Sequence, residues 1–308
     1  MSSSLMTFTT DCCEKEYIER ISDVIYRKSA SINRTIVGSE AYIDRLRDFV
    51  FCAYGNPHSK DVIEAMRSTN SCKKTIRVAI HFGDENECTV TAYHFFDYVF
   101  RFYMPHTCDM KKVFPINIGF SSLGMTVDET IVKSFSKEPR TINTRENDVF
   151  FIGQSGISVS RDAMFALKSI LKRLKTSDNG KAKVKIKKTN GFGRGVDMKT
   201  YRRLLDSSKI CLVPGGMSPE TFRYTEAMAS GCIVVTDCAN DSVYYYKNAP
   251  IIKIDKWNAD AVSKIQSLLL KTDDELNEMG RASRTYYETV LSPEATADYI
   301  LDIITKAQ

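Results

Sequence analysis

Residues 209–236 constrain the fold more than any other part of the sequence. An apolar run at 209–213 ends at a Pro-Gly-Gly turn, an amphipathic stretch follows over 219–230, and a second apolar run occupies 232–236. Apolar runs of this length on either side of a helical stretch are typical of two parallel strands joined by a helix. We therefore predict strands at 209–213 and 232–236 and a helix over 219–230.

The same alternation continues on both sides of this unit. Strands and helices are predicted in turn from residue 148 to residue 288, and this order is typical of an α/β domain whose parallel sheet has helices on both faces. We place this domain at 139–290. The other predicted segments are strands at 148–152, 183–187 and 250–254 and helices at 161–174, 198–205, 259–270 and 274–288.

A last helix is expected over 291–308. Ser292 and Pro293 form a good N-cap and first-turn pair, and apolar residues recur at helical spacing from Tyr299 to Ile304. This helix lies beyond the bounds of the C-terminal domain, and we expect it to pack back on the N-terminal domain.

The first 138 residues are predicted to form a separate, Rossmann-like domain. Residues 16–27 and 41–51 have the periodicity of amphipathic helices. The runs at 76–82, 95–103 and 113–120 are rich in aromatic and β-branched residues, as strands are. The polar, charged stretch from 133 to 148 is expected to link this domain, 1–138, to the next one.

The totals for the whole chain exclude several classes of protein. The chain has 308 residues, enough for two domains, and its net charge of +5 falls short of the dense basic fields that nucleic-acid binding requires. The nine cysteines include no CxxC pair, so they indicate neither a zinc site nor a disulfide framework. No signal-peptide core follows the N-terminus, and no window reaches 18 apolar residues. We therefore expect a cytoplasmic protein without a membrane span or a nucleic-acid partner.

The turn after residue 213 is the best candidate for a ligand site. Gly215 and Gly216 allow a ligand to approach the backbone closely, and Ser218 and Pro219 suit the N-cap and the first turn of the following helix. The start of a helix offers N–H groups and a partial positive charge, which favour a diphosphate. Ligands of open α/β sheets bind at the carboxyl ends of the strands, where this turn would lie.

Two charged residues on the predicted helix extend this site. Arg223 and Glu226 are three residues apart and share one helical face. The guanidinium can pair with phosphate oxygens in a bidentate fork, and the carboxylate, one turn deeper, can accept hydrogen bonds from a ribose. The alternative is an Arg–Glu pair on the surface, which would add only tenths of a kcal/mol. The position after a Gly-Gly turn favours the ligand-binding interpretation.

The residues around this turn resemble the donor-binding signature of the exostosin family. The longest matches are Ser-Lys-Ile-Cys-Leu-Val-Pro-Gly-Gly at 208–216 and Thr-Phe-Arg-Tyr-Thr-Glu-Ala-Met-Ala-Ser-Gly-Cys-Ile-Val-Val at 221–235. Shorter matches are Phe-Phe-Ile-Gly at 150–153 and His-Phe-Gly-Asp-Glu-Asn at 81–86, and the resemblance covers roughly residues 76–260. The departures are Val234, where the family usually has proline, and Phe222, where it has a serine- or threonine-like residue.

The resemblance implies an inverting glycosyltransferase of the GT-B fold, in which two Rossmann-like domains face a central cleft. It implies a UDP-sugar donor, with xylose as the best guess from compact viral and bacterial members, and a hydroxyl of an oligosaccharide or glycan as acceptor. The N-terminal domain would then lie on the acceptor side, and the C-terminal domain would bind the donor.

The resemblance also implies roles for single residues. Glu226 would hold the ribose and Arg223 the diphosphate. Arg161 and Arg194 are weaker phosphate candidates, with the alternative of solvated arginines on a helix and a loop. Arg101 lies in an aromatic strand and would need an anionic partner, either the donor phosphate or a carboxylate on the nearby loop. The further donor-binding candidates are Gly215, Gly216, Ser218, Thr221, Phe222, Gly153, Ser155, Arg161, Arg194 and Arg101.

An inverting transfer needs a base that takes the proton of the acceptor hydroxyl. Asp84 and Glu85 follow the predicted strand 76–82, and we prefer Asp84, although two adjacent carboxylates can also be solvated turn residues. His81 is more typical of a packed core histidine. No Asp-x-Asp sequence occurs in the chain, so we expect neither a metal ion nor a bound cofactor, and the leaving diphosphate would be neutralised by arginine and the helix dipole.

Three other functions fit parts of the sequence. A retaining GT-B enzyme would place a second carboxylate near the glycine turn, and Glu220 could be that residue. A non-catalytic module that binds a nucleotide sugar or a glycan would keep the same donor site. A nicotinamide-dependent oxidoreductase needs a complete glycine fingerprint, which the cluster at 191–195 lacks.

Overall fold

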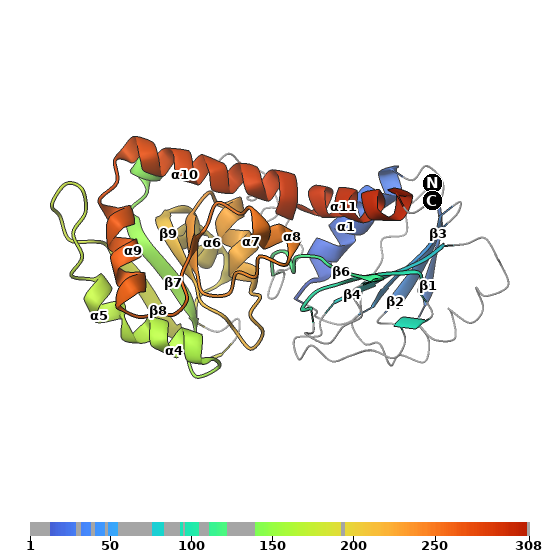
Figure 1. Ribbon diagram of the computed structural model, residues 1–308, viewed down its shortest axis with the longest axis horizontal. Helices are drawn as coiled ribbons and strands as arrows, with labels where there is room; N and C mark the ends of the chain where they lie inside the picture. Colours follow the sequence, from blue (N-terminus) through green and yellow to red (C-terminus); the bar gives the residue numbers. More distant parts are fainter. Residues whose placement is uncertain are drawn as a thin grey trace. The chain divides into compact units, whose positions relative to one another are not determined.

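The computed structural model describes residues 13–28, 32–37, 41–46, 49–54, 76–82, 93–94, 96–104, 111–121, 139–191 and 195–306. The chain divides into two compact units, the first made of Met1–Leu123 and Ser292–Gln308 and the second of Gly124–Leu291 (Figure 1). The candidates Asp84, Glu85 and Arg194 lie outside the described residues.

The second unit is built on a sheet of five parallel strands. They are β7 (Asn147–Gln154), β8 (Val184–Thr189), β9 (Ser208–Val213), β10 (Ile233–Thr236) and β11 (Ile252–Lys253). Their order in the sheet is β8-β7-β9-β10-β11, so the chain moves outward from β7 first in one direction and then in the other. The boundary between β7 and β9 is therefore the topological switch point, where ligands of such sheets bind.

Helices cover both faces of this sheet (Figure 1). Alternate strand residues such as Phe151 and Leu212 join one core with helices α4, α5, α9 and α10. On the opposite face Phe150 lies beside Tyr201 of α6, with 5.8 Å between the ring centroids. This alternation follows from the pleat of a strand. The helices are α4 (Val159–Ala166), α5 (Lys168–Leu171), α6 (Met198–Asp206), α7 (Phe222–Ala229), α8 (Tyr244–Lys247), α9 (Ala259–Leu269) and α10 (Asp273–Tyr286), with single turns at Ile142–Thr144 and Tyr287–Leu291.

The first unit has a sheet of six strands in sequence order. They are β1 (Ile32–Val37), β2 (Ala41–Leu46), β3 (Phe49–Tyr54), β4 (Ile76–His81), β5 (Tyr98–Arg101) and β6 (Val113–Pro115). Strands β3 to β6 are parallel, and β1 and β2 extend them in antiparallel fashion. With a sheet and helices in each unit, the predicted α/β class is confirmed.

The helix predicted at 41–51 is wrong, because these residues form β2 and the start of β3. The stretch is short and rich in aromatic and β-branched side chains, so it also fits strands. Pairing of β2 with β1 and β3 decides between the two structures, since the environment of a strand outweighs local periodicity. The helix predicted at 16–27 is confirmed as α1 (Lys15–Lys28).

The C-terminal helix α11 (Pro293–Lys306) belongs to the first unit, where it packs against α1 (Figure 1). Ser292 caps it, as expected, since its Oγ accepts a hydrogen bond from the Ala295 N–H at 3.1 Å. Buried polar groups join the two helices to the loop after β6. The Tyr17 hydroxyl donates to Asn117 Oδ1 at 2.9 Å and lies 2.8 Å from Thr296 Oγ1, to which Asn117 Nδ2 donates at 3.0 Å.

Removing the Tyr17 hydroxyl is expected to lower the free energy of unfolding by about 1–3 kcal/mol, because Asn117 and Thr296 would each lose a buried partner. Urea unfolding of Tyr17→Phe, followed by circular dichroism, measures this loss. In a double-mutant cycle with Thr296→Val, the combined loss should be smaller than the sum of the two, since both remove the same contact. Additive losses would show that the two hydroxyls are not energetically coupled.

Within the described residues, no helix combines the length and the apolar composition needed to cross a membrane.

Candidate functional site

The loops after β7 and β9 are hydrogen-bonded to each other at the carboxyl edge of the second unit's sheet. The Ser158 hydroxyl donates to the Gly215 carbonyl at 2.6 Å, and the Gly215 N–H donates to Ser160 Oγ at 3.0 Å and to Asp237 Oδ1 at 3.2 Å. Trp257 Nε1 donates to the same Ser160 oxygen at 3.1 Å. The glycine turn is therefore fixed to the start of α4 and to the loop after β10.

The two glycines have a role in packing that the sequence did not predict. A Cβ on Gly216 would lie 3.0 Å from Nη2 of Arg161, and a Cβ on Gly215 would lie 3.0 Å from Sγ of Cys238. Their N–H groups bind protein acceptors, since Gly216 donates to the Ser218 carbonyl at 2.9 Å. The glycines therefore allow the side chains of Arg161 and Cys238 to pack closely against the turn. The sequence had predicted a different role, in which the ligand approaches the backbone of the turn.

The helix after this turn begins later than predicted, and Ser218 is not its N-cap. Helix α7 starts at Phe222 with Thr221 as the extended N-cap residue. In the turn before α7, the Ser218 carbonyl accepts a hydrogen bond from the Gly216 N–H and the Ser218 hydroxyl accepts one from the Glu220 N–H. Because of this local bonding, the helix begins after the turn and not at Ser218. The Thr221 side chain does not cap the helix. Its Oγ1 is buried and makes no hydrogen bond with any residue that the structure describes.

Arg223 joins α7 to the end of β7, at the switch point. Its Nε and Nη2 donate to the Ile152 carbonyl at 3.1 and 2.9 Å, and its guanidinium lies 4.9 Å from the centre of the Phe151 ring. The Nε–Nη2 edge is therefore bound to protein. Nη1 makes no hydrogen bond with a described residue, so a ligand would meet the Nη1–Nη2 edge.

Glycine at position 153 makes room for this arginine. A Cβ there would lie 2.7 Å from Arg223 Nη2 and 2.8 Å from Cζ of Phe151, closer than real contacts allow. Gly153 is one of the predicted donor-site residues, and its place in the structure is beneath the guanidinium. The neighbouring candidate Ser155 lies half-buried on the loop between β7 and α4.

Gly153→Ala is expected to displace Arg223 and, if this arginine holds the predicted diphosphate, to weaken UDP binding roughly tenfold, since small misplacements of a positioned group have large effects. Isothermal titration calorimetry with UDP measures this change. In the Arg223→Ala background, the same substitution should add little, because the group that it displaces is already gone. An equal loss in both backgrounds would contradict this role for Gly153.

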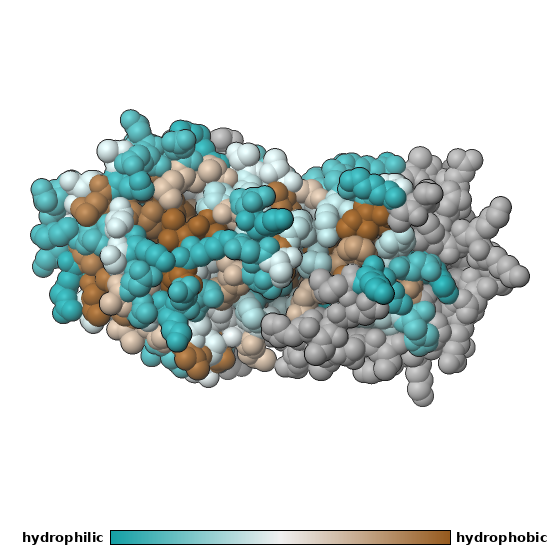
Figure 2. All heavy atoms as spheres, viewed as in Figure 1, coloured by the Kyte–Doolittle hydropathy of each residue, from teal (hydrophilic) through white to brown (hydrophobic). Residues whose placement is uncertain are grey.

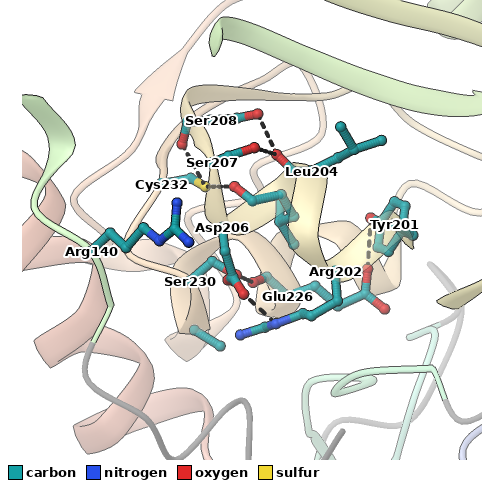
Figure 3. Close-up of polar contacts among 12 residues, drawn as sticks. Arg140, Tyr201, Arg202, Leu204, Asp206, Ser207, Ser208, Glu226, Ser230 and Cys232 are labelled. Carbon is teal, nitrogen blue, oxygen red and sulfur yellow. Dashed lines mark hydrogen bonds and ion pairs between the residues drawn. The ribbon is translucent and has the colours of Figure 1, made fainter. Parts of the chain in front are cut away.

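Glu226 lies one turn further along α7 and is only 4% exposed. The Tyr201 hydroxyl of α6 donates to Glu226 Oε2 at 2.9 Å, as Figure 3 shows. Burial and the nearby carboxylate raise the pKa of Tyr201 well above its usual value, so that hydroxyl stays protonated. Because Glu226 is buried and Arg223 donates to the Ile152 carbonyl, the alternative of an Arg–Glu pair on the surface is wrong.

Arg161 is a second arginine at this edge. It lies in the first turn of α4, where its N–H donates to the capping Ser158 Oγ at 3.2 Å. Its side chain is buried, so the alternative of a solvated helix arginine is wrong. Phe222, the first residue of α7, is also buried.

Arg101 lies in the first unit, at the end of β5. Its Nε donates to the Phe102 carbonyl at 3.0 Å and its Nη1 donates to the Tyr93 hydroxyl at 2.8 Å. The same hydroxyl lies 2.7 Å from Nδ1 of His81. Burial and the charge of Arg101 lower the pKa of His81 to about 3, which leaves this histidine neutral and packed in the core.

Several residues that shape the site were not predicted. Ser158, Ser160 and Asp237 fix the glycine turn, and Tyr201 orients Glu226. Asp237 directly follows a predicted strand, and this position at a carboxyl end could have drawn attention to it. The two serines carry no such signal, because their contacts are distant in sequence.

Comparisons with known proteins link this region to sugar transfer. Residues 166–302 match the family model described as glycosyl transferase-like. A segment of 115 residues, 34% of this chain, is 30% identical to the Exostosin-1 homolog of Caenorhabditis elegans. The match spans 28% of the length of that relative.

Two solved structures are similar at low sequence identity. One is TarM of S. aureus, solved with UDP, with a TM-score of 0.45, 12% identity and coverage of 96% of this chain and 83% of that one. The other is an alpha-glucosyltransferase in complex with UDP and DNA, with a TM-score of 0.48, 10% identity and coverage of 95% and 83%. The family match includes the glycine turn and α7, and it supports the predicted enzyme class, a glycosyltransferase.

Proposed function

We propose that this chain is a GT-B glycosyltransferase that takes its sugar from a UDP-sugar and binds the donor diphosphate at the start of α7. One observation carries the proposal. Thr221, with a buried hydroxyl that bonds no described residue, and Arg223, with Nη1 unbound, stand together at the switch point of a parallel sheet. A helix start at such a point favours an anionic ligand.

The charges at this edge suit a diphosphate. Arg223 and the buried Arg161 supply two guanidinium groups, and the start of α7 adds the partial positive charge of its dipole. Glu226 lies one turn deeper with its carboxylate oriented by Tyr201, as a group that accepts ribose hydroxyls should be. The proposed donor therefore lies along α7, with the diphosphate at its first residues and the ribose beside Glu226.

We propose an inverting reaction on this donor. An acceptor hydroxyl oxygen forms a bond to the anomeric carbon as the bond from that carbon to the diphosphate oxygen breaks, and the hydroxyl proton moves to a carboxylate, for which Asp84 is the first candidate. The leaving UDP gains negative charge, which the arginines and the helix dipole offset without a metal ion. The expected absence of a metal ion and the role of Asp84 as the base are proposed from the sequence.

The sugar and the acceptor are proposed from the exostosin resemblance, which the match to the nematode relative supports over 115 residues. UDP-xylose is the first donor to test, and a hydroxyl of an oligosaccharide or glycan is the proposed acceptor.

Thermal stabilisation by a panel of nucleotides tests this proposal, because a ligand of the folded state raises its stability. We expect UDP and one UDP-sugar to raise the melting temperature and ADP and GDP to have little effect. No shift with any uridine nucleotide would reject the donor assignment. Donor binding without transfer to any glycan would favour the non-catalytic module.

The anomeric configuration of the product, read by NMR, tests the inverting stereochemistry. Retention would favour a mechanism that uses Glu220, whose Oε1 accepts from the Tyr245 hydroxyl at 2.6 Å near the start of α7. Inversion would agree with a base in the first unit.

A further inference from the structure

One end of the second unit carries a concentrated positive charge. Residues 168–188, here called the basic edge, have nine basic residues and one acidic residue, a formal charge of +8. The whole chain has +5, so the other residues together carry −3. The net charge of the whole chain is therefore small although this segment is strongly basic. The basic residues are Lys168, Lys172, Arg173, Lys175, Lys181, Lys183, Lys185, Lys187 and Lys188.

The basic edge follows a continuous stretch of the chain. It runs from α5 through the segment in which Lys175 pairs with Lys181 to β8, the last strand of the sheet. All nine basic residues except the half-buried Lys168 are exposed. Figure 2 shows hydrophilic side chains gathered at this end of the second unit, with hydrophobic ones between them.

The part of the chain that the structure describes supplies no acidic partner for this charge. None of the nine basic side chains forms an ion pair with a residue that the structure describes, and their recorded contacts are with uncharged groups, such as Lys187 Nζ with the Gly195 carbonyl at 2.8 Å. Elsewhere an exposed lysine pairs with a carboxylate one turn away, as Lys306 does with Asp302 at 2.6 Å.

The lysines along β8 are close enough for their charges to repel one another. Lys183, Lys185 and Lys187 alternate, so they lie on one side of the strand about 6.6 Å apart, which is within the Debye length of about 8 Å at physiological salt. An external anionic surface would relieve this repulsion.

Protection of the sheet edge explains only part of this charge. Lysines on an edge strand prevent it from pairing with other chains, and those on β8 can serve that purpose. Lys172, Arg173, Lys175 and Lys181 lie outside the strand, where there is no edge to protect. The charge extends across several elements, as a contact surface does.

Two exposed apolar side chains favour a membrane over a soluble polyanion. Ile170, 38% exposed, lies on α5 among the lysines, and Leu270, 54% exposed, follows α9. The Leu269 carbonyl accepts from the Ser177 N–H at 3.0 Å, which places Leu270 beside the basic edge. We infer that the basic edge, with Ile170 and Leu270, is a contact surface for a membrane containing anionic lipids, independently of the proposed function.

Co-sedimentation with lipid vesicles tests this inference. We expect the chain to bind vesicles of equimolar phosphatidylcholine and phosphatidylserine, to release them at high salt, and not to bind phosphatidylcholine alone. Since each lysine near an anionic bilayer strengthens attachment by roughly fivefold, Lys185→Gln with Lys187→Gln should lower the partition coefficient by roughly tenfold or more.

A matched double variant controls for total charge. Lys253→Gln with Lys306→Gln makes the same change in charge at the half-buried Lys253 on β11, at the opposite edge of the sheet, and at the exposed Lys306 on α11. It should leave the partition coefficient nearly unchanged.

Ile170→Ser with Leu270→Ser should lower vesicle binding without a change in charge. Circular dichroism melting curves verify that all variants fold alike.

Three results would overturn the inference. The first is no binding to phosphatidylserine vesicles, and the second is an equal loss in the two lysine double variants. The third is binding to a heparin oligosaccharide that depends on Lys185 and Lys187 while vesicle binding does not, which would identify a soluble polyanion as the partner.

Discussion

Replacing Arg223 with alanine is expected to weaken UDP binding tenfold or more, about 1.4 kcal/mol. The guanidinium is held by the Ile152 carbonyl at the end of β7, and its Nη1 makes no hydrogen bond with a residue that the structure describes. A diphosphate at that point would lose a charged, bidentate donor. Arg223→Lys should recover only part of the affinity, since an ammonium keeps the charge and loses the fork. Isothermal titration calorimetry measures both variants.

Glu226→Ala should cause a loss of similar size, because the carboxylate proposed to hold the ribose would be gone. The matched controls are Arg281→Ala and Glu278→Ala, which remove the same side chains from exposed positions on α10. Both controls should bind UDP as the unchanged chain does. Unchanged affinity in Arg223→Ala and Glu226→Ala, with normal melting curves, would remove both residues from the donor site.

Asp84→Asn is expected to reduce turnover by roughly a hundredfold or more while UDP binding is retained, because a general base contributes about 10²–10⁴-fold to such a step. The amide has nearly the shape of the carboxylate but cannot take the proton of the acceptor hydroxyl. Initial rates of sugar transfer, measured with the donor that the stabilisation panel identifies, give this ratio.

Glu85→Gln is the control for this variant, since it makes the same chemical change at the adjacent position. It should retain most of the activity. If Asp84→Asn turns over normally and Glu85→Gln does not, the neighbouring carboxylate is the base. Normal turnover in both would exclude the pair and leave the base to another group.

The fold of the second unit could largely be predicted from the sequence. Strands β9 and β10 and the helices α6 and α9 begin or end within one residue of their predicted bounds, because continuous apolar runs and clear helical periodicity mark them. Helix α7 starts three residues late, at Phe222 instead of 219, because the signal from Ser218 and Pro219 is local. The hydrogen bond from Gly216 to the Ser218 carbonyl, which keeps them in the turn, depends on the folded loop.

The place of the candidate residues in the fold could be predicted from the sequence, but their contacts could not. The glycine turn, Arg223 and Glu226 all lie at or near the carboxyl edge of the second unit's sheet, as the predicted order of strands and helices indicated. That Gly153 makes room for Arg223, and that Tyr201 binds Glu226, depends on residues 70 and 25 positions apart in the chain. Such pairs arise from tertiary packing, which periodicity and local spacing do not encode.

A crystal structure of the chain with UDP tests the central claim most directly. We predict a diphosphate at the start of α7, within hydrogen-bond reach of the Thr221 hydroxyl and Arg223 Nη1, and a ribose that bonds to Glu226. A diphosphate at the amino ends of the strands, or one bound by the first unit alone, would contradict it.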